Sequence, residues 1–262
     1  MSRIYDALAK AREDSRSLRV VDVEPPVTHR SDLKDLVVIN EPDSSLAESF
    51  RFLRAQMLRP TIGTAPRSIL ITSAIPGEGK TFVAANLAAC VSQTPERHVL
   101  LMDSDLRLPS IHKVFGLNGR REGLSNFLTS DVPLAPLIQS SFLDRLSILT
   151  AGSFRAIPGE ILSSRKMRDL MGELNNQSPD QLVIVDSPPL ELTPESSLLA
   201  QDVDAVLIVV RNGFTSRSQV LKALGRIRRE KLIGVVYNGY DQSRRTYDRY
   251  KLYEQGYGRK GR

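Results

Sequence analysis

Residues 67–89 read RSILITSAIPGEGKTFVAANLAA and decide the fold. The aliphatic run at 69–71 predicts a buried strand, and the residues after Thr81 predict a helix. Between them, Gly77 and Gly79 let backbone N–H groups point inward around phosphate oxygens, and the following helix adds its positive N-terminal end. The segment is therefore a phosphate-binding P-loop, with Ala74 in place of the usual first glycine.

The end of this loop specifies the ligand more closely. Lys80 is placed to bridge the β- and γ-phosphates, and Thr81 to offer its hydroxyl to Mg²⁺. These two residues imply a nucleoside triphosphate, since a dinucleotide-binding loop has a different glycine spacing. The alternative, a glycine-containing turn that merely joins strand to helix, leaves the Lys-Thr pair unexplained. We predict a nucleotide site formed by Gly77, Glu78, Gly79, Lys80, Thr81 and Phe82.

From residue 67 onward, short aliphatic runs alternate with helical stretches, which is the pattern of βαβ units. The continuously apolar runs at 182–185 and 206–210 are typical of a parallel sheet covered on both faces. We predict an α/β fold of the P-loop NTPase type, with a doubly wound, mostly parallel sheet and ligands at the carboxyl ends of its strands. The expected segments are an N-terminal helix and polar linker (1–40), the P-loop domain (41–240) and a flexible tyrosine-rich tail (241–262).

Composition sets limits on the protein class. The chain has 262 residues, of which 41% are hydrophobic and 25% charged, as in an ordinary globular domain. No run approaches the roughly 18 apolar residues that a membrane span needs, and the N-terminus lacks the apolar core of a signal peptide, so we expect a cytoplasmic protein. The single cysteine, Cys90, lies in an apolar run and is expected to be buried rather than catalytic.

Three acids end predicted strands at the catalytic edge of such a sheet. Asp186 follows the run at 182–185, and Asp103 and Asp105 follow the run at 99–102. A carboxylate at the position of Asp186 can hold the Mg²⁺ shell during phosphoryl transfer. One acid of the Asp103 and Asp105 pair could orient or deprotonate a nucleophile while the other attends to the metal. The alternative is that these acids only cap the next helices.

At this point the sequence resembles the bacterial tyrosine kinases of polysaccharide export, which are similar to the Min and Par positioning ATPases. The resemblance covers roughly residues 40–262 and rests on SAIPGEGKT (73–81), LLMDSDLRLP (100–109), VIVDSPP (183–189), AESFRFLR (47–54) and the tyrosine-rich end. Positioning ATPases carry a signature lysine early in the loop, where this chain has Ile75. One departure is TPE at 193–195, where many relatives read TDA, and no catalytic role is inferred for Glu195.

The resemblance implies an enzyme that transfers phosphate from ATP to protein tyrosine. It places Lys80 and Thr81 on ATP and Mg²⁺, Asp105 and Asp186 on Mg²⁺, and Asp103 as the candidate base for the tyrosine hydroxyl. Lys80, Asp103, Asp105 and Asp186 are thus the expected catalytic residues. It also implies a role in exopolysaccharide or capsule synthesis and export. The implied partner is a membrane adaptor of the chain-length-determinant type, which would recruit the kinase to the inner face of the cell membrane.

The predicted helix around AESFRFLR has two faces. Leu46, Phe50, Leu53 and Met57 fall within about 60° of one another and are expected to face the core. The charged arc resembles the family's E-x-x-R-x-x-R subunit contact, which implies a homo-oligomeric ring held through Glu48, Arg51 and Arg54. The alternative is a solvated arc, with Ser45 and Glu48 forming a capping box.

Five of the seven tyrosines lie in the last 23 residues. Segment 241–262 carries seven Arg or Lys against three acids, and little aliphatic support for packing. We predict that phosphorylation inverts the sign of this tail, because each phosphate adds about −1.5 to −2 charges. An unmodified tail would dock at a neighbouring site in the ring and a phosphorylated one would be expelled. The predicted acceptors are Tyr247, Tyr250, Tyr253 and Tyr257, whereas Tyr5 and Tyr237 are expected to pack.

Two other functions compete with the autokinase. A positioning ATPase would use its basic tail on DNA or anionic membrane. The absent signature lysine and the tyrosine cluster argue against that class, so nucleic acid is not an expected partner and the membrane only an indirect one. A nucleotide-sensing scaffold of the export machinery would keep the fold without the chemistry, and the intact set of Lys80, Thr81 and the three acids argues against it.

Overall fold

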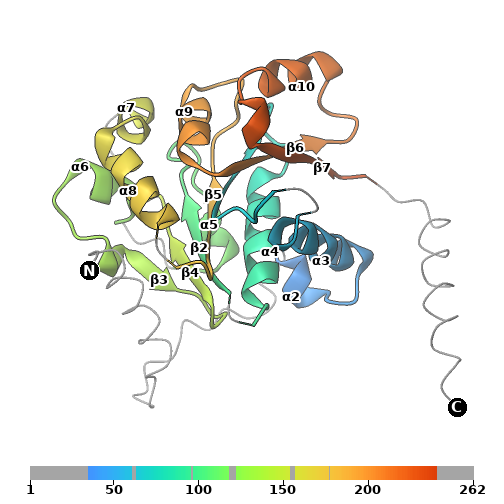
Figure 1. Cartoon of the computed structure of the whole chain (residues 1–262), viewed down its shortest axis with the longest axis horizontal. Coiled ribbons are helices and arrows are strands. Elements are labelled where there is room, and N and C mark those ends of the chain that lie inside the picture. Colours follow the sequence, from blue (N-terminus) through green and yellow to red (C-terminus); the bar gives the residue numbers. More distant parts are fainter. Residues whose placement is uncertain are drawn as a thin grey trace, which may run out of the picture.

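A seven-stranded sheet forms the middle layer of the computed structural model, and helices cover both of its faces (Figure 1). The structure describes residues 35–60, 63–95, 97–117, 122–153, 157–176 and 178–240. The strand order is β3-β4-β2-β5-β1-β6-β7. The predicted N-terminal helix and the tyrosine-rich tail lie outside the described residues.

The sheet is parallel except at one edge, as the doubly wound prediction requires. The exception is β3, a three-residue strand that pairs antiparallel with β4 and that the sequence pattern did not predict. The strands are β1 (Ser68–Ser73), β2 (His98–Asp103), β3 (Ile138–Ser140), β4 (Leu146–Leu149), β5 (Gln181–Asp186), β6 (Ala205–Arg211) and β7 (Leu232–Asn238). Every residue of β1 and β5 is buried, since both lie in the centre of the sheet.

Two apolar clusters join the helices to the sheet, one on each face. One face is covered by α6 (Leu124–Thr129), α7 (Pro158–Leu162), α8 (Arg165–Asn175), α9 (Glu195–Asp202) and α10 (Arg217–Leu224). The other carries α2 (Val37–Asn40), α3 (Ser45–Leu58), α4 (Lys80–Ser92) and α5 (Ile111–Val114). The 3₁₀ turns η2 (Ala135–Leu137) and η3 (Arg229–Lys231) precede β3 and β7. Within these described segments, no helix combines the length and the apolarity that crossing a bilayer would demand.

The P-loop has the backbone that its glycines predict. Gly77 and Gly79 have φ values of 82° and 90°, in the left-handed region that favours glycine. A Cβ at Gly79 would lie 2.2 Å from Nδ2 of Asn238, so this position also lacks room for a side chain. The loop leads directly into α4, which is buried from Val83 to Ser92 and anchors the site in the core.

Helix α3 differs from its prediction in its cap and in its core face. Its N-cap is Ser44, whose hydroxyl accepts from the Ala47 N–H, so the Ser45 capping box of the alternative interpretation does not form. Leu46 is 43% exposed and was wrongly assigned to the core, whereas Phe50 and Met57 are buried as predicted. The helix begins one residue earlier than expected and turns Ala47, not Leu46, against its neighbours.

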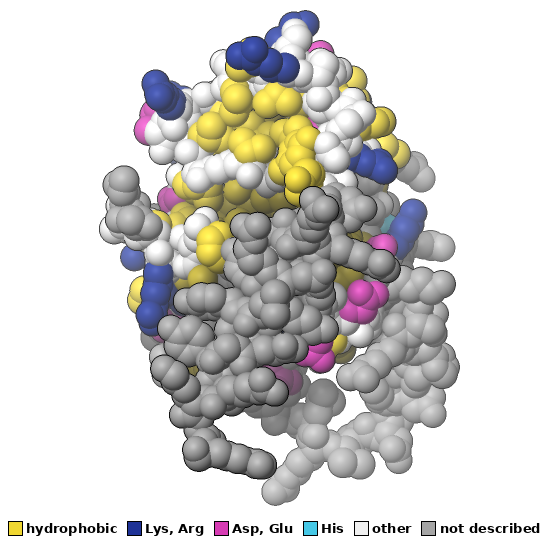
Figure 2. Space-filling model, turned by 90° about the vertical axis from the view of Figure 1, so that its right-hand side faces the viewer, with side chains coloured by type: hydrophobic (Ala, Val, Ile, Leu, Met, Phe, Trp, Pro, Cys, Tyr) yellow, Lys and Arg dark blue, Asp and Glu magenta, His cyan; other side chains and the backbone are white. Residues whose placement is uncertain are grey.

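Tyr237 was also wrongly expected to pack in a core strand. It is 54% exposed, on β7, which is an edge strand of the sheet that the described residues form. Its hydroxyl donates to Asn212 Oδ1, and its ring lies 5.8 Å from that of Tyr240. Figure 2 looks onto this side of the molecule and shows hydrophobic side chains gathered there; exposed ones on β7 include Ile233 and Val235. Cys90 is buried, as predicted.

Candidate active site

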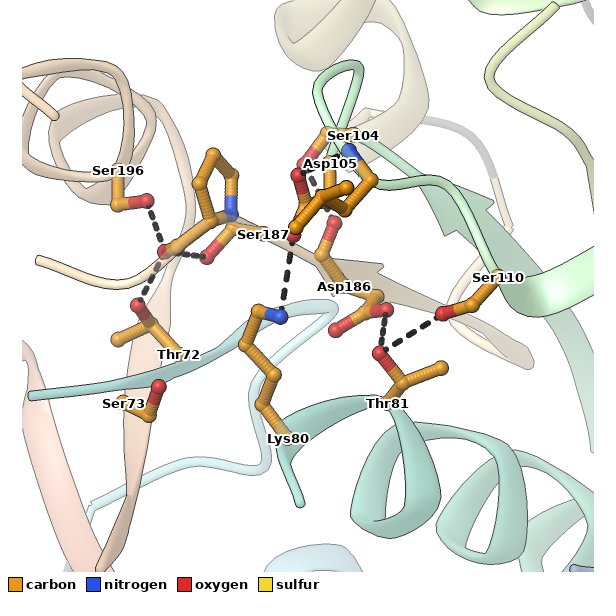
Figure 3. Close-up of polar contacts among 12 residues, drawn as sticks. Thr72, Ser73, Lys80, Thr81, Ser104, Asp105, Ser110, Asp186, Ser187 and Ser196 are labelled. Carbon is orange, nitrogen blue, oxygen red and sulfur yellow. Dashed lines mark hydrogen bonds and ion pairs between the residues drawn. The ribbon is translucent and has the colours of Figure 1, made fainter. Parts of the chain in front are cut away.

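Lys80, Thr81, Asp105 and Asp186 meet at the carboxyl edge of the sheet, near the ends of β1, β2 and β5 (Figure 3). Asp103 and Asp186 end adjacent strands and are paired in register. Lys80 and Thr81 are the first two residues of α4, which follows β1. Since β5 lies between β2 and β1, this topology brings together side chains that are far apart in the sequence.

Thr81 and Asp186 form the part of the site suited to a metal. The Thr81 hydroxyl donates to Asp186 Oδ2 at 2.7 Å, and the Ser110 hydroxyl donates to Thr81 Oγ1 at 3.2 Å. Asp186 is fully buried, and its Oδ1 has no hydrogen-bond partner among the described residues. A buried carboxylate oxygen beside a hydroxyl fits Mg²⁺, which takes one or two protein ligands and completes its shell with phosphates and water. Consistently, no protein-only cluster of three metal-ligating His, Cys, Asp or Glu side chains occurs in the described ranges.

Lys80 is held by an ion pair with Asp105. The Lys80 Nζ lies 3.0 Å from Asp105 Oδ2, and the two side chains are 15% and 4% exposed. The other oxygen of Asp105 accepts from the Leu108 N–H at 3.1 Å. Asp105 therefore both neutralises Lys80 and shapes the loop after β2.

Asp103 organises the same loop through backbone bonds. Its Oδ2 accepts from the N–H groups of Ser110 and Ile111 at 3.0 and 3.1 Å, and its Oδ1 accepts from Asp105 N–H at 3.2 Å. Ile111 is the first residue of α5, so Asp103 does what the helix-capping alternative proposed. The structure thus gives Asp103 a structural task in addition to any catalytic one.

The two strand-ending acids have perturbed pKa values. Burial, followed by repulsion from Asp186, raises the pKa of Asp103 to about 8. Burial also raises the pKa of Asp186 to about 6, against the opposing effect of the Lys80 charge. At neutral pH the site therefore holds a proton, which a bound cation would displace.

This proton makes stability depend on pH. An unfolded Asp103 ionises near 3.8 and the folded one near 8, so between these values the folded state holds a proton that the unfolded state lacks. Unfolding free energy of the metal-free protein should fall as pH rises from 6 to 8, by at most about 1.4 kcal/mol per pH unit. Urea unfolding at several pH values, with Asp103→Asn as the control, measures this. Equal pH slopes for the two proteins would contradict the assignment.

Glu78 lies in the P-loop but its side chain turns into the protein. It is fully buried and accepts from the Ile75 N–H at 2.8 Å, from the Arg211 N–H at 3.2 Å and from the Thr215 hydroxyl. Asn238 donates to the Glu78 carbonyl at 2.8 Å. The loop is therefore braced by the ends of β6 and β7. Sequence reasoning missed these braces, because nothing in the pattern marks their partners.

Phe82, predicted to bind nucleotide, directs its ring toward helix α3. The rings of Phe82 and Phe50 are 5.9 Å apart in an edge-to-face arrangement, which belongs to the core contact between α4 and α3. Nucleotide contact through the Phe82 backbone stays a prediction.

An ion pair that sequence reasoning did not predict lies beside the acids. Arg107 Nη2 contacts Glu195 Oε1 at 2.8 Å, and the Glu195 side chain is fully buried. Burial alone would raise the pKa of Glu195, but the hydrogen bonds from Arg107, the Glu195 backbone and Thr193, together with the charge of Arg107, outweigh it, and the pKa lies below its usual value. The sequence feature that pointed to Glu195 was the TPE at 193–195, which departs from the TDA of many relatives.

The three residues predicted to contact a neighbouring copy have different environments in one chain. Glu48 is exposed and pairs with Arg51 on the same helix. Arg54 is partly buried and donates to the Cys90 carbonyl at 3.1 Å, which ties α3 to α4. Their role in assembly stays a prediction. The four predicted acceptor tyrosines lie outside the described residues.

The fold and the site together define a P-loop nucleotide-binding protein, and comparison with known proteins agrees. Residues 69–260 match the family described as "CobQ/CobB/MinD/ParA nucleotide binding domain". The chain is 32% identical to the tyrosine-protein kinase YwqD of Bacillus subtilis over 215 residues, which are 81% of this chain and 89% of that relative.

Solved structures point to the same group of proteins. The chimerical protein CapA2B2 matches with a TM-score of 0.69 and 32% identity, over 78% of this chain and 89% of that one. The kinase domain of the Escherichia coli tyrosine kinase ETK matches with a TM-score of 0.71 and 30% identity, over 78% and 79% of the two chains. The chain belongs to the family of bacterial tyrosine-protein kinases, and the predicted family, fold and enzyme class are confirmed.

Proposed function

We propose that this kinase transfers the γ-phosphoryl group of ATP, with Mg²⁺, to tyrosines in the C-terminal tail of a neighbouring copy. The observation that carries the proposal is the convergence of Lys80, Thr81 and Asp186 at one sheet edge, with the Thr81 hydroxyl 2.7 Å from the Asp186 carboxylate. This set supplies the phosphate-bridging cation and the metal ligands that phosphoryl transfer needs. The tail supplies the acceptors, since the four predicted acceptor tyrosines all lie within residues 247–257.

Each residue has a separate task in the proposed reaction. Lys80 would bind the β- and γ-phosphates of ATP in place of Asp105, and Asp105, Thr81 and Asp186 would hold Mg²⁺. Mg²⁺ held there would supply positive charge that offsets the charge on the phosphate oxygens. The bond from the γ-phosphorus to the β,γ-bridging oxygen breaks as the tyrosine oxygen bonds to phosphorus, and ADP leaves.

Asp103 is the proposed acceptor of the tyrosine proton. A bound cation would lower the raised pKa of Asp103 and displace the proton that it holds, which would leave the carboxylate able to accept the tyrosine proton. Its three backbone hydrogen bonds fix its position at the end of β2. A fixed base next to the metal ligands suits this role.

We also propose a setting in exopolysaccharide or capsule synthesis and export. In it the kinase forms a ring through the α3 face and is recruited from the cytoplasm to the inner face of the membrane by an adaptor of the chain-length-determinant type. Membership of the family supports this setting, because this chain matches bacterial tyrosine-protein kinases and the setting is the one that its resemblance to those of polysaccharide export implies. The exposed position of Glu48 supports the ring, because its carboxylate can exchange its pairing with Arg51 for a cation of a neighbouring copy.

The ring makes a testable prediction. Glu48→Lys should weaken self-association at least about 10-fold, because it places a third cation on the arc of Arg51 and Arg54. Light scattering across a concentration series measures the assembled fraction. Gln56→Ala, at another exposed position of α3, is the matched control. Equal assembly by the two variants would refute the proposed contact.

The proposed activity is tested by supplying labelled ATP with Mg²⁺, with and without excess EDTA, and measuring phosphotyrosine on the full chain. Label that requires Mg²⁺ supports the kinase. ATP hydrolysis without phosphotyrosine, together with salt-sensitive binding to DNA or anionic liposomes, would favour a positioning ATPase instead.

A further inference from the structure

The ion pair between Arg107 and Glu195 joins three segments of the chain. Arg107 lies in the loop after β2, and Glu195 is the first residue of α9. A Cβ at Gly159, in α7, would lie 3.4 Å from Glu195 Oε1, so the carboxylate also borders that helix. The Glu195 side chain is fully buried, while that of Arg107 is 48% exposed. The cation therefore reaches from the rim of the site down to a buried anchor.

The position of Arg107 within its loop matters. The loop is closed by Asp103, which accepts from the N–H groups of Ser110 and Ile111, and by Asp105, which accepts from that of Leu108. Arg107 lies inside this closed segment, two residues after the acid that pairs with Lys80. A displacement of Arg107 would therefore move Asp105 relative to Lys80.

Burying a carboxylate is a poor way to gain stability alone. The cost of removing both charges from water offsets most of their attraction, and an apolar pair of similar volume is often as stable. An ion pair adds geometric specificity, because a guanidinium N–H must point at the carboxylate oxygen to form the hydrogen bond. The pair thus fits a positioning task better than a purely stabilising one.

We propose that the Arg107–Glu195 pair is a positioning device that holds the loop of Asp103 and Asp105 against Lys80 and Asp186. This inference rests on the proposed phosphotransfer function and assigns to Glu195 a role that its sequence position did not reveal. Both are positioning residues, since they act through the loop and not by touching ATP. We therefore expect loss of the pair to slow the metal-dependent transfer of phosphate and to leave nucleotide binding without metal nearly unchanged.

Glu195→Gln is the first test, because it removes the charge while keeping the volume and an acceptor oxygen. In the full-length protein kcat should fall about 10–100-fold, as is usual for residues that orient metal ligands. The affinity for ADP in EDTA should stay within about threefold of wild type, since the P-loop and Lys80 are unchanged. Arg165→Gln, which breaks the exposed Arg165–Asp169 pair, is the matched control and should change neither quantity.

A second set of variants separates positioning from folding. Arg107→Gln leaves a buried carboxylate unpaired and should lower the melting midpoint by roughly 6–20 °C. The double variant R107Q/E195Q removes both charges and should regain most of that midpoint, while kcat stays low. Arg107→Lys keeps the charge and should regain part of kcat. If the double variant regained both its melting midpoint and its kcat, the proposal would be overturned.

Two further outcomes are decisive. Glu195→Gln with a kcat within about threefold of the wild-type value would overturn the positioning role. If wild type shows no phosphotransfer, the proposed function fails. The positioning role of the Arg107–Glu195 pair is then tested by measuring nucleotide binding. In that case Mg²⁺ should strengthen ADP binding in wild type and about 10-fold less in Glu195→Gln. An equal effect of Mg²⁺ in both proteins would overturn the inference independently of catalysis.

Discussion

Lys80→Met is expected to lower the rate of tyrosine phosphorylation by at least about 10²–10³-fold. Lys80 begins α4 and is the cation of the P-loop, so its loss removes the charge that stabilises the transferred phosphoryl group. Methionine keeps the unbranched apolar stem and most of the length of the side chain, so the main change is the loss of the charge. Phosphotyrosine formed per minute at saturating ATP measures the effect.

This variant needs a control for stability. Lys80 neutralises Asp105, whose side chain is 4% exposed, so Lys80→Met alone leaves a nearly buried carboxylate without its cation and should cost up to about 3 kcal/mol. The double variant K80M/D105N removes both charges and should recover much of that stability without recovering activity. Activity within about tenfold of wild type in either variant would show that Lys80 does not carry the phosphoryl charge.

Asp186→Asn is expected to have a comparably large effect on activity and the opposite effect on stability. The introduced amide would still accept from the Thr81 hydroxyl, but the buried charge that suits Mg²⁺ would be gone, and the rate should fall about 10²–10³-fold. The metal-free protein should be as stable as wild type or more so, because burial disfavours the Asp186 charge and so raises its pKa, and the amide removes that charge. Thermal melting with and without Mg²⁺ and ADP measures both properties.

The contrast between these measurements identifies the metal ligand. Mg²⁺ should raise the melting midpoint of ADP-bound wild type and have little effect on ADP-bound Asp186→Asn. Ser187→Ala is a nearby control, since the Ser187 hydroxyl bonds to backbone carbonyls of the core and not to Thr81. An undiminished Mg²⁺ effect in Asp186→Asn would assign the metal to other residues.

The sequence predicted the central sheet, the P-loop and the acids at the strand ends because each depends on local pattern. A buried parallel strand is a continuous apolar run, and β1, β5 and β6 show that run directly. The turn at Gly77 and Gly79 is likewise set by residue type. Since the carboxyl ends of parallel strands share one edge, the meeting of Asp103 and Asp186 followed from the strand assignments.

Partners of individual side chains were not predictable in this way. Glu195 lies 88 positions from Arg107, and Glu78 lies 133 positions from Arg211. Such contacts depend on how loops fold after the strands are in place, and no local periodicity encodes them. The same reason explains the error at Tyr237, because a single strand pattern does not say which strand forms the sheet edge.

Phosphosite mass spectrometry of the full chain produced in bacteria tests the central claim most directly. Wild type should carry phosphate on one or more of Tyr247, Tyr250, Tyr253 and Tyr257, and Lys80→Met and Asp103→Asn should carry none. If wild type has no phosphotyrosine, even with ATP, Mg²⁺ and an adaptor segment supplied, the autokinase account is contradicted.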